Sequence, residues 1–194
     1  AMGQPSKPSE ETAGPAACRQ ISAVSNGTTD AFFYLNSVID YSFNFALHAK
    51  MVANPSWRLT TANGTDVHAL GSLWGYNMTN PAMRQAWVAE CVTAVQNGCR
   101  GCFIDQANVA ETAGLPKSPR TAAYTAAHLQ ALDELSAALA PMDGYAIFNH
   151  LGVNGTHAGT AMMIEVILVL SLIRMFTRKF RTKCAEINYV AHSI

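Results

Sequence analysis

Short apolar runs alternate with amphipathic segments between residues 30 and 165. Four runs lack polar interruptions and resemble strands buried on both faces, namely residues 31–36, 102–105, 145–148 and 161–164. Each run ends in a polar residue or is followed by one. Buried strands that alternate with helices predict a parallel sheet with right-handed crossovers. The predicted fold class is therefore α/β.

Two amphipathic helices are predicted between these strands. Asn80 before Pro81 is a strong helix start, and Asn97-Gly98 is a left-handed stop. Ser118 before Pro119 repeats the start signal, and the second helix is predicted to reach Ala140. Periodic apolar residues mark the buried faces: Met83, Trp87, Val88, Cys91, Val92 and Val95 in the first helix, and Leu129, Leu132, Leu135 and Leu139 in the second.

The chain divides into three segments by composition. Residues 1–29, rich in Pro, Ser, Gly, Ala and Thr, predict a flexible leader or linker, and residues 30–165 form the α/β domain. Residues 166–194 begin with an apolar run and continue with a basic one. The apolar run is shorter than the about 20 residues that a membrane helix needs, so no membrane span is predicted. The basic run suits a solvated helix face or an interfacial segment.

Charge and glycosylation motifs indicate the cellular setting. Thirteen basic and thirteen acidic side chains balance, which argues against nucleic acid as a partner. Sequons occur at Asn26, Asn63, Asn77 and Asn154. Asn-Gly-Thr is also ordinary turn chemistry, but four sequons in one short chain favour a secreted, extracellular glycoprotein.

The five cysteines are an odd number, so at least one is free or bonded to another chain if the rest are oxidised. Cys99-Arg-Gly-Cys102 has the spacing of a redox or zinc motif, which keeps a thiol-based redox protein as one hypothesis. A second ligand pair at zinc spacing is missing, and the motif follows a helix rather than a strand. A structural disulfide or a buried thiol is the favoured interpretation, and we expect no metal and no cofactor.

Functional groups of parallel α/β sheets gather at the carboxyl ends of the strands. Asp105 and Glu165 directly follow buried strand cores and are the candidate catalytic carboxylates. A glycosidase needs one carboxyl group as general acid and one as nucleophile or base, about 5 to 5.5 Å apart in retaining enzymes and about 6.5 to 9.5 Å in inverting ones. Each could instead cap a helix or pair with Arg. Asp40 and Glu111 are second-tier acids, whereas Glu90, Asp133 and Glu134 are expected to be solvated on helices.

Other polar and aromatic residues could bind a sugar at the same edge. Asn36, Asn149 and His150 share the strand-end position and could bind hydroxyl groups, although asparagine is also a routine turn former. Trp74 and Tyr76 precede the Asn80 helix and could form an apolar platform for a sugar face, or could pack in the core.

Three passages carry a family resemblance: 33–36 (FYLN), 74–87 (WGYNMTNPAMRQAW) and 101–108 (GCFIDQAN). Their order resembles a glycoside-hydrolase-like TIM-barrel family and, more distantly, secreted hydrolases of amino-sugar and galactose polymers. The resemblance covers about residues 30–165. It implies a catalytic acid at Asp105 and a later strand-end partner at Glu165.

A complete barrel has eight strands and typically about 250 residues. This chain predicts four strands, with a fifth around Trp57–Thr60, and the sequence after Glu165 does not resemble the later strands. We therefore expect a parallel (β/α) barrel of partial or atypical form, from a truncated, alternatively spliced or read-through product.

The sequence favours a glycoside hydrolase that cleaves a polysaccharide or glycan with two carboxylates. The alternative is a non-catalytic carbohydrate-binding or structural barrel fragment. A carbohydrate is the expected partner in both cases. Substrate, linkage and oligomeric state do not follow from the sequence.

Overall fold

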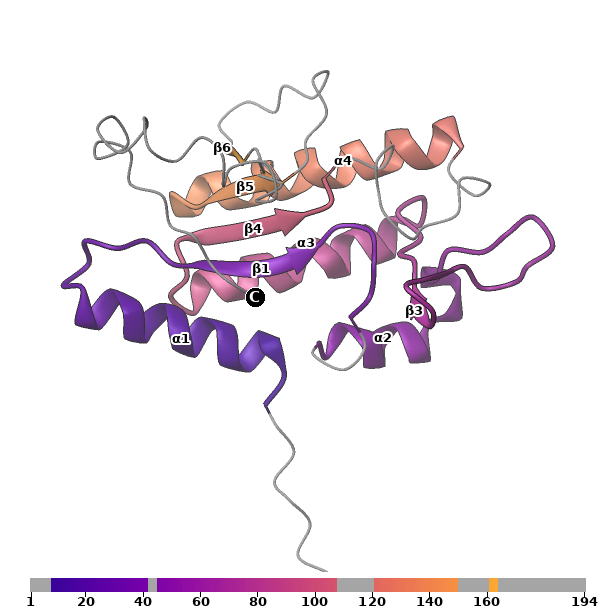
Figure 1. Ribbon diagram of the computed structural model, residues 1–194. Coiled ribbons are helices and arrows are strands. Elements are labelled where there is room, and N and C mark those ends of the chain that lie inside the picture. Colours follow the sequence, from indigo (N-terminus) through magenta and orange to yellow (C-terminus); the bar gives the residue numbers. More distant parts are fainter. Residues whose placement is uncertain (1–7, 42–44, 108–120, 150–160, 164–194) are drawn as a thin grey trace, which may run out of the picture. The chain divides into compact units, whose positions relative to one another are not determined.

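The computed structural model describes residues 8–41, 45–107, 121–149 and 161–163. Four strands of this part form one parallel sheet in the order β1-β4-β5-β6 (Figure 1). Their bounds are Phe32–Asn36 (β1), Gly101–Asp105 (β4), Tyr145–Asn149 (β5) and Ala161–Met163 (β6). The predicted α/β class and its parallel sheet are confirmed. A closed barrel is not seen in the described residues.

Helices α3 (Pro81–Gln96) and α4 (Ala122–Leu139) connect successive strands of the sheet. Asn80 caps α3 as predicted, since its side-chain Oδ1 accepts from the amide of Ala82 at 3.0 Å. The predicted start of α4 was wrong: Thr121 is the N-cap, and its hydroxyl accepts from the amide of Tyr124. The predicted buried position of Leu129 was also wrong, since its side chain is exposed.

Alternate residues of the strands face the helices. Cys102 of β4 forms a disulfide with Cys91 of α3, and Ile104 is likewise fully buried. Because successive side chains of a strand point to opposite faces, Phe103 and Asp105 face away from α3. The helical face of the sheet is the main core, and the other face carries the polar strand ends.

Helix α1 (Glu10–Val24) lies where composition predicted a flexible leader. Its Cys18 is 3% exposed and forms a disulfide with Cys99, just before β4. A Cβ at Gly14 would lie 2.8 Å from the ring of Phe33, so α1 packs closely on β1. The leader prediction failed here because a covalent and packed contact with distant residues orders this stretch.

A small insertion lies between β1 and α3. It contains α2 (Leu47–Ala53), a 3-10 turn (η1, Pro55–Trp57) and the antiparallel strands β2 (His68–Ala69) and β3 (Leu73–Trp74). The strand predicted around Trp57–Thr60 is instead this 3-10 turn followed by isolated bridges at Arg58 and Thr60. A second 3-10 helix of three residues, Ala140–Met142 (η3), directly follows α4.

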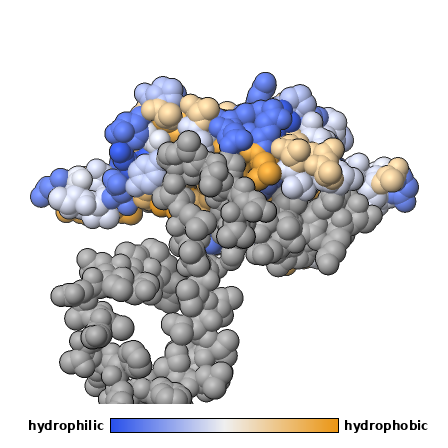
Figure 2. Space-filling model, turned by 90° about the horizontal axis from the view of Figure 1, so that it is seen from above, coloured by the Kyte–Doolittle hydropathy of each residue, from blue (hydrophilic) through white to orange (hydrophobic). Residues whose placement is uncertain are grey.

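The described helices include none that is both long and apolar enough to cross a lipid bilayer. Among the coloured residues of Figure 2, most are hydrophilic or intermediate in hydropathy, and hydrophobic residues form smaller patches.

Candidate functional site

The carboxyl ends of β1, β4 and β5 bring three predicted site residues to one edge of the sheet. Asn36 pairs in register with Asp105, and Asn149 ends the neighbouring strand β5. The Asn149 amide Nδ2 donates to Asp105 Oδ1 at 2.9 Å. Asn36, Asp105 and Asn149 thus lie side by side, as expected for residues at the carboxyl ends of neighbouring parallel strands. Glu165, His150 and Glu111 lie outside the described residues.

Within the described residues, the carboxylate of Asp105 accepts three hydrogen bonds. Besides Asn149, the backbone amide of Gln106 donates to Oδ1 at 2.9 Å and the hydroxyl of Tyr34 donates to Oδ2 at 3.0 Å. The side chain is only partly buried. All three neighbours are donors, so this arrangement suits a carboxylate that accepts, and it fixes the direction of both oxygens.

Tyr34 is a site residue that the sequence reasoning missed. Its ring is 39% exposed and stacks on Phe103 at 6.1 Å between centroids. Burial raises the pKa of the Tyr34 hydroxyl well above 10, the Asn36 side chain lowers it, and the charge of Asp105 raises it further. Tyr34 therefore stays protonated at neutral pH and donates to Asp105. Tyr34 lies two residues before Asn36 and therefore on the same face of β1. This spacing could have predicted Tyr34 as a site residue.

If Asp105 is catalytic, as the family resemblance implies, Tyr34→Phe should lower kcat by about tenfold with little change in folding stability, because it removes one hydrogen bond to the carboxylate and leaves the ring stacking intact. Steady-state kinetics on a responsive glycan, with urea unfolding in parallel, measures both quantities. A kcat equal to that of the wild type would show that this hydrogen bond does not support turnover.

Asn36 and Asn149 are both almost fully buried, at 1% and 2% exposure. Asn36 Oδ1 accepts from the amides of Val38 and Ile39 at 2.8 Å, which is a turn-forming role. Asn36 Nδ2 and Asn149 Oδ1 have no hydrogen-bond partner in the described part of the chain. A buried donor, Asn36 Nδ2, and a buried acceptor, Asn149 Oδ1, thus lie on the two strands that flank Asp105. Buried polar atoms are normally hydrogen-bonded, so both could bind polar atoms of a ligand.

The predicted aromatic platform is largely occupied by protein. Tyr76 is 1% exposed, and its burial raises the pKa of its hydroxyl well above 10. Trp74 stacks on His48 with 4.8 Å between centroids, and the guanidinium of Arg58 lies 3.8 Å from the Trp74 ring centroid. Tyr76 thus packs in the core, and the ring of Trp74 is in contact with the side chains of His48 and Arg58. The core-packing alternative describes these residues better than a free sugar platform does.

Asp40 lies in the loop after β1 and is paired with a histidine. Its Oδ2 is 2.5 Å from His48 Nδ1, while its Oδ1 is buried without a partner in the described residues. Burial raises the pKa of Asp40, and its hydrogen bond with His48 and the charge of His48 lower it; the nearby charge of Glu11 raises it again. The net shift is upward. Asp40 is 1% exposed, so it would have to act through His48 rather than touch a substrate.

Asp40→Asn should flatten the fall of folding stability with rising pH. Because the folded pKa lies above 3.8, the folded protein keeps this proton to higher pH than the unfolded chain does. The stabilisation from this group is therefore complete below the unfolded pKa and is lost as pH rises through the folded pKa. Urea unfolding of both proteins from pH 4 to 7 measures it. Parallel pH profiles would contradict the expectation.

The thiols of the CxxC motif are bonded to other cysteines. Cys99 pairs with Cys18 and Cys102 with Cys91, and all four side chains are buried. The structural-disulfide interpretation of this motif is confirmed, and a dithiol between Cys99 and Cys102 is not formed. The described residues contain no group of three or more His, Cys, Asp or Glu side chains that could hold a metal ion.

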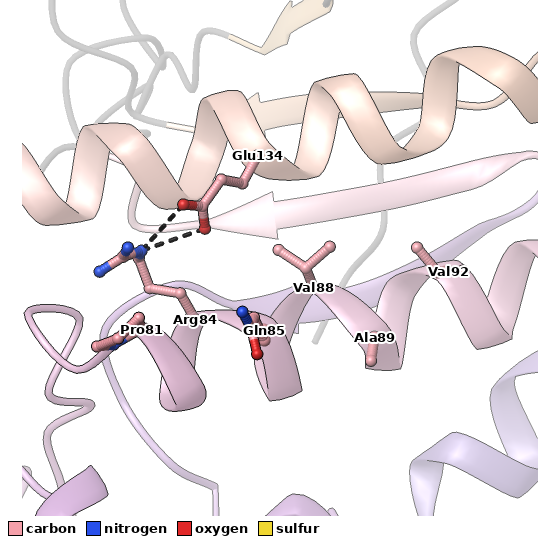
Figure 3. Close-up of a pocket in the computed structure, with 7 residues that line it drawn as sticks. All are labelled: Pro81, Arg84, Gln85, Val88, Ala89, Val92 and Glu134. Atoms are coloured by element: carbon pink, nitrogen blue, oxygen red, sulfur yellow. Dashed lines mark hydrogen bonds and ion pairs between the residues drawn. The ribbon is translucent and has the colours of Figure 1, made fainter.

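A groove of about 450 Å³ lies between α3 and α4 (Figure 3). Arg84 of α3 points toward Glu134 of α4 there, with Arg84 Nε 3.1 Å from Glu134 Oε2. This groove is on the helical side of the sheet, whereas Asp105 faces the opposite side.

The prediction that Glu90 is solvated was wrong. Its side chain is 7% exposed and forms an ion pair with Lys50.

Comparison with solved structures shows a similar fold at low sequence identity. A variant of the glycoside hydrolase domain of PelA from Pseudomonas aeruginosa has a TM-score of 0.50 and 14% identity, with 77% of this chain and 55% of that chain covered. An alpha-galactosidase from Thermus thermophilus, in complex with p-nitrophenyl alpha-D-galactopyranoside, has a TM-score of 0.49 and 16% identity, with 68% and 26% covered. The chain thus spans about half of the first protein and a quarter of the second.

Comparison of the sequence with protein families gives a direct assignment. A search of curated proteins returned no match. Hypothetical glycosyl hydrolase family 15 matches residues 26–166, which include β1, α3, β4, α4, β5 and β6. This match covers more than half of the 194 residues. The chain therefore belongs to hypothetical glycosyl hydrolase family 15.

Proposed function

We propose that the protein is a glycoside hydrolase that cleaves a polysaccharide or glycan at the carboxyl edge of its parallel sheet. The observation that carries this proposal is the carboxylate of Asp105, held by Tyr34, Gln106 and Asn149 at the end of β4. Membership of a glycosyl hydrolase family supports the same chemistry. The sheet would then be part of a (β/α) barrel, as in the resembling family.

Asp105 is suited to act as nucleophile or base. In the described part of the chain its two oxygens face three hydrogen-bond donors, an arrangement that favours the ionised, accepting form of the group. Glycosidic cleavage needs a carboxylate of this kind on the anomeric carbon or on a water molecule, together with a separate general acid. We assign the general acid to Glu165, which follows β6 in the sequence by two residues.

The buried polar atoms beside Asp105 suit a ligand rich in hydroxyl groups. A sugar hydroxyl both donates and accepts, so it can satisfy the Asn36 Nδ2 donor or the Asn149 Oδ1 acceptor. Tyr34, exposed on the same strand face as Asn36, offers an aromatic surface beside the carboxylate. His150, which directly follows Asn149 in the sequence, is proposed as a further residue that binds the sugar.

We also propose that the protein acts outside the cell. Two disulfides pair four of the five cysteines, which is typical of oxidising compartments. Asn26 and Asn63 stand in exposed turns, each followed by a glycine with positive φ, and their sequons are accessible. Secreted protein from eukaryotic cells should therefore carry sugar at these asparagines.

The function is tested by a hydrolysis screen over a panel of polysaccharides and glycans. Wild-type protein should release reducing ends from at least one member, and Glu165→Gln should lose that activity. Asp133→Asn, a change at an exposed carboxylate in the middle of α4, is the matched control and should keep it. Glycan binding without release of reducing ends would favour the non-catalytic alternative, and full activity of Glu165→Gln would remove Glu165 from the mechanism.

A further inference from the structure

A buried histidine of α4 contacts the loop that follows β1. His128 is 1% exposed, and its Nε2 lies 3.0 Å from the hydroxyl oxygen of Ser37, which is itself fully buried. The neighbouring buried residues of the helix include Tyr124, Leu132 and Leu135. An imidazole at such a position costs free energy unless its nitrogen atoms form hydrogen bonds, and the contact with Ser37 satisfies Nε2.

The direction of this hydrogen bond follows from the donors and acceptors around Ser37. The Ser37 hydroxyl oxygen lies 3.0 Å from the carbonyl oxygen of Asp105 and 2.8 Å from that of Gln106. Carbonyl oxygens only accept, so both contacts draw on the single hydroxyl hydrogen of Ser37. The Gln106 carbonyl is the nearer of the two, and the Asp105 carbonyl already accepts from the Ser37 amide at 3.0 Å, so we assign the hydroxyl hydrogen to Gln106. With that assignment, His128 Nε2 carries the hydrogen and donates to Ser37.

Gln106 connects this network to the candidate catalytic carboxylate. It adopts a left-handed conformation with φ of 55°, which residues other than glycine rarely adopt. Its carbonyl is held by Ser37, and its amide donates to Asp105 Oδ1 at 2.9 Å. The turn at Gln106 thus sets the direction of one carboxylate oxygen, and the surrounding hydrogen bonds hold this unfavourable turn in place.

We propose that His128 is a positioning residue, which acts through Ser37 and the Gln106 turn to orient the carboxylate of Asp105. This inference rests on the proposed function, in which Asp105 is the nucleophile or base. Loss of the His128 donor frees the Ser37 hydroxyl to rotate and relaxes the turn. The reaction then slows while the substrate contacts remain, so kcat falls on the order of tenfold and KM stays within about twofold.

The test compares four variants on a glycan that the wild type cleaves. His128→Leu and Ser37→Ala should each lower kcat, and the double variant should be no slower than the slower single variant, because both break one relay. His128→Gln keeps an amide donor and should restore most of kcat. Additive losses in the double variant, or no recovery in His128→Gln, would overturn the relay.

Tyr124→Phe is the matched control for a purely structural effect. Tyr124 lies one helical turn before His128, and its hydroxyl donates a buried hydrogen bond to the Tyr76 carbonyl at 3.0 Å. This variant loses a buried hydrogen bond of the same helix but none to Ser37. Its kcat should equal that of the wild type; an equal loss of kcat in Tyr124→Phe and His128→Leu would overturn the positioning role.

A second measurement needs no activity. In ¹H–¹⁵N NMR spectra, the Gln106 amide resonance should shift in His128→Leu and Ser37→Ala and should stay in place in Tyr124→Phe. An unmoved Gln106 resonance in His128→Leu overturns the positioning inference whatever the kinetics show. If instead the resonance moves but Asp105→Asn keeps full turnover, the network stands and the proposed role of Asp105 fails.

Discussion

Asp105→Asn should lower kcat on a responsive glycan by on the order of 10³ or more. The substitution keeps the shape of the side chain but removes the negative charge and one accepting oxygen. Tyr34, Asn149 and Gln106 all donate to this group, so the new amide nitrogen would have to face a donor. The variant therefore loses the charged oxygen that would react and at least one of the hydrogen bonds that orient the side chain.

The folding stability of Asp105→Asn should change by less than about 2 kcal/mol, because the side chain is partly exposed and one acceptor remains. Urea unfolding separates this small effect from the loss of turnover. Asp143→Asn is the isosteric control at a surface carboxylate with 89% side-chain exposure, and it should keep wild-type kcat. A kcat within tenfold of the wild type in Asp105→Asn would exclude Asp105 as nucleophile or base.

Cys18→Ala should lower the free energy of unfolding by about 2 to 4 kcal/mol. The Cys18–Cys99 disulfide joins residues 81 positions apart and holds α1 against the start of β4. Its loss lets the unfolded chain explore more conformations, and the gain in entropy grows with the length of the closed loop. The packing of Gly14 on Phe33 would remain to hold α1, so the protein should still fold.

Chemical denaturation of Cys18→Ala, Cys99→Ala and the double variant measures this effect. Each single change already breaks the bond, so the double variant should be about as stable as the less stable single variant. Losses that add up in the double variant would mean that side-chain packing, and not the disulfide, stabilises this contact. The midpoint of unfolding by circular dichroism is a sufficient measurement.

The sequence predicted the sheet and the start of α3 because their signals are local. An apolar run that ends in a polar residue marks β1, β4 and β5, and Asn80 with Pro81 marks the cap of α3. Helix α1 could not be predicted in this way, because its order depends on a disulfide to Cys99 and on packing against β1. Buried and exposed positions of α4 also depend on the neighbouring elements: the apolar Leu129 is exposed while the polar His128 is buried.

The candidate site was predictable as far as the strand-end rule reaches. This rule placed Asn36, Asp105 and Asn149 at one edge, since parallel strands end together. Tyr34 was hidden inside an apolar run, because its contact with Asp105 requires the register of β1 on β4. The accessibility of Trp74 and Tyr76 depended on the insertion after β1, whose packing has no periodic signal in the sequence.

Chemical rescue tests the catalytic role of Asp105 most directly. Asp105→Ala should lack turnover of an activated aryl glycoside, and added azide or formate should restore it, because a small anion can occupy the space of the missing carboxylate and attack the anomeric carbon or activate water. The restored rate should rise with anion concentration, and with azide a glycosyl azide should form if the anion attacks directly. Turnover of Asp105→Ala at the wild-type rate without added anion, or no rescue by either anion in the folded variant, would contradict the proposed mechanism.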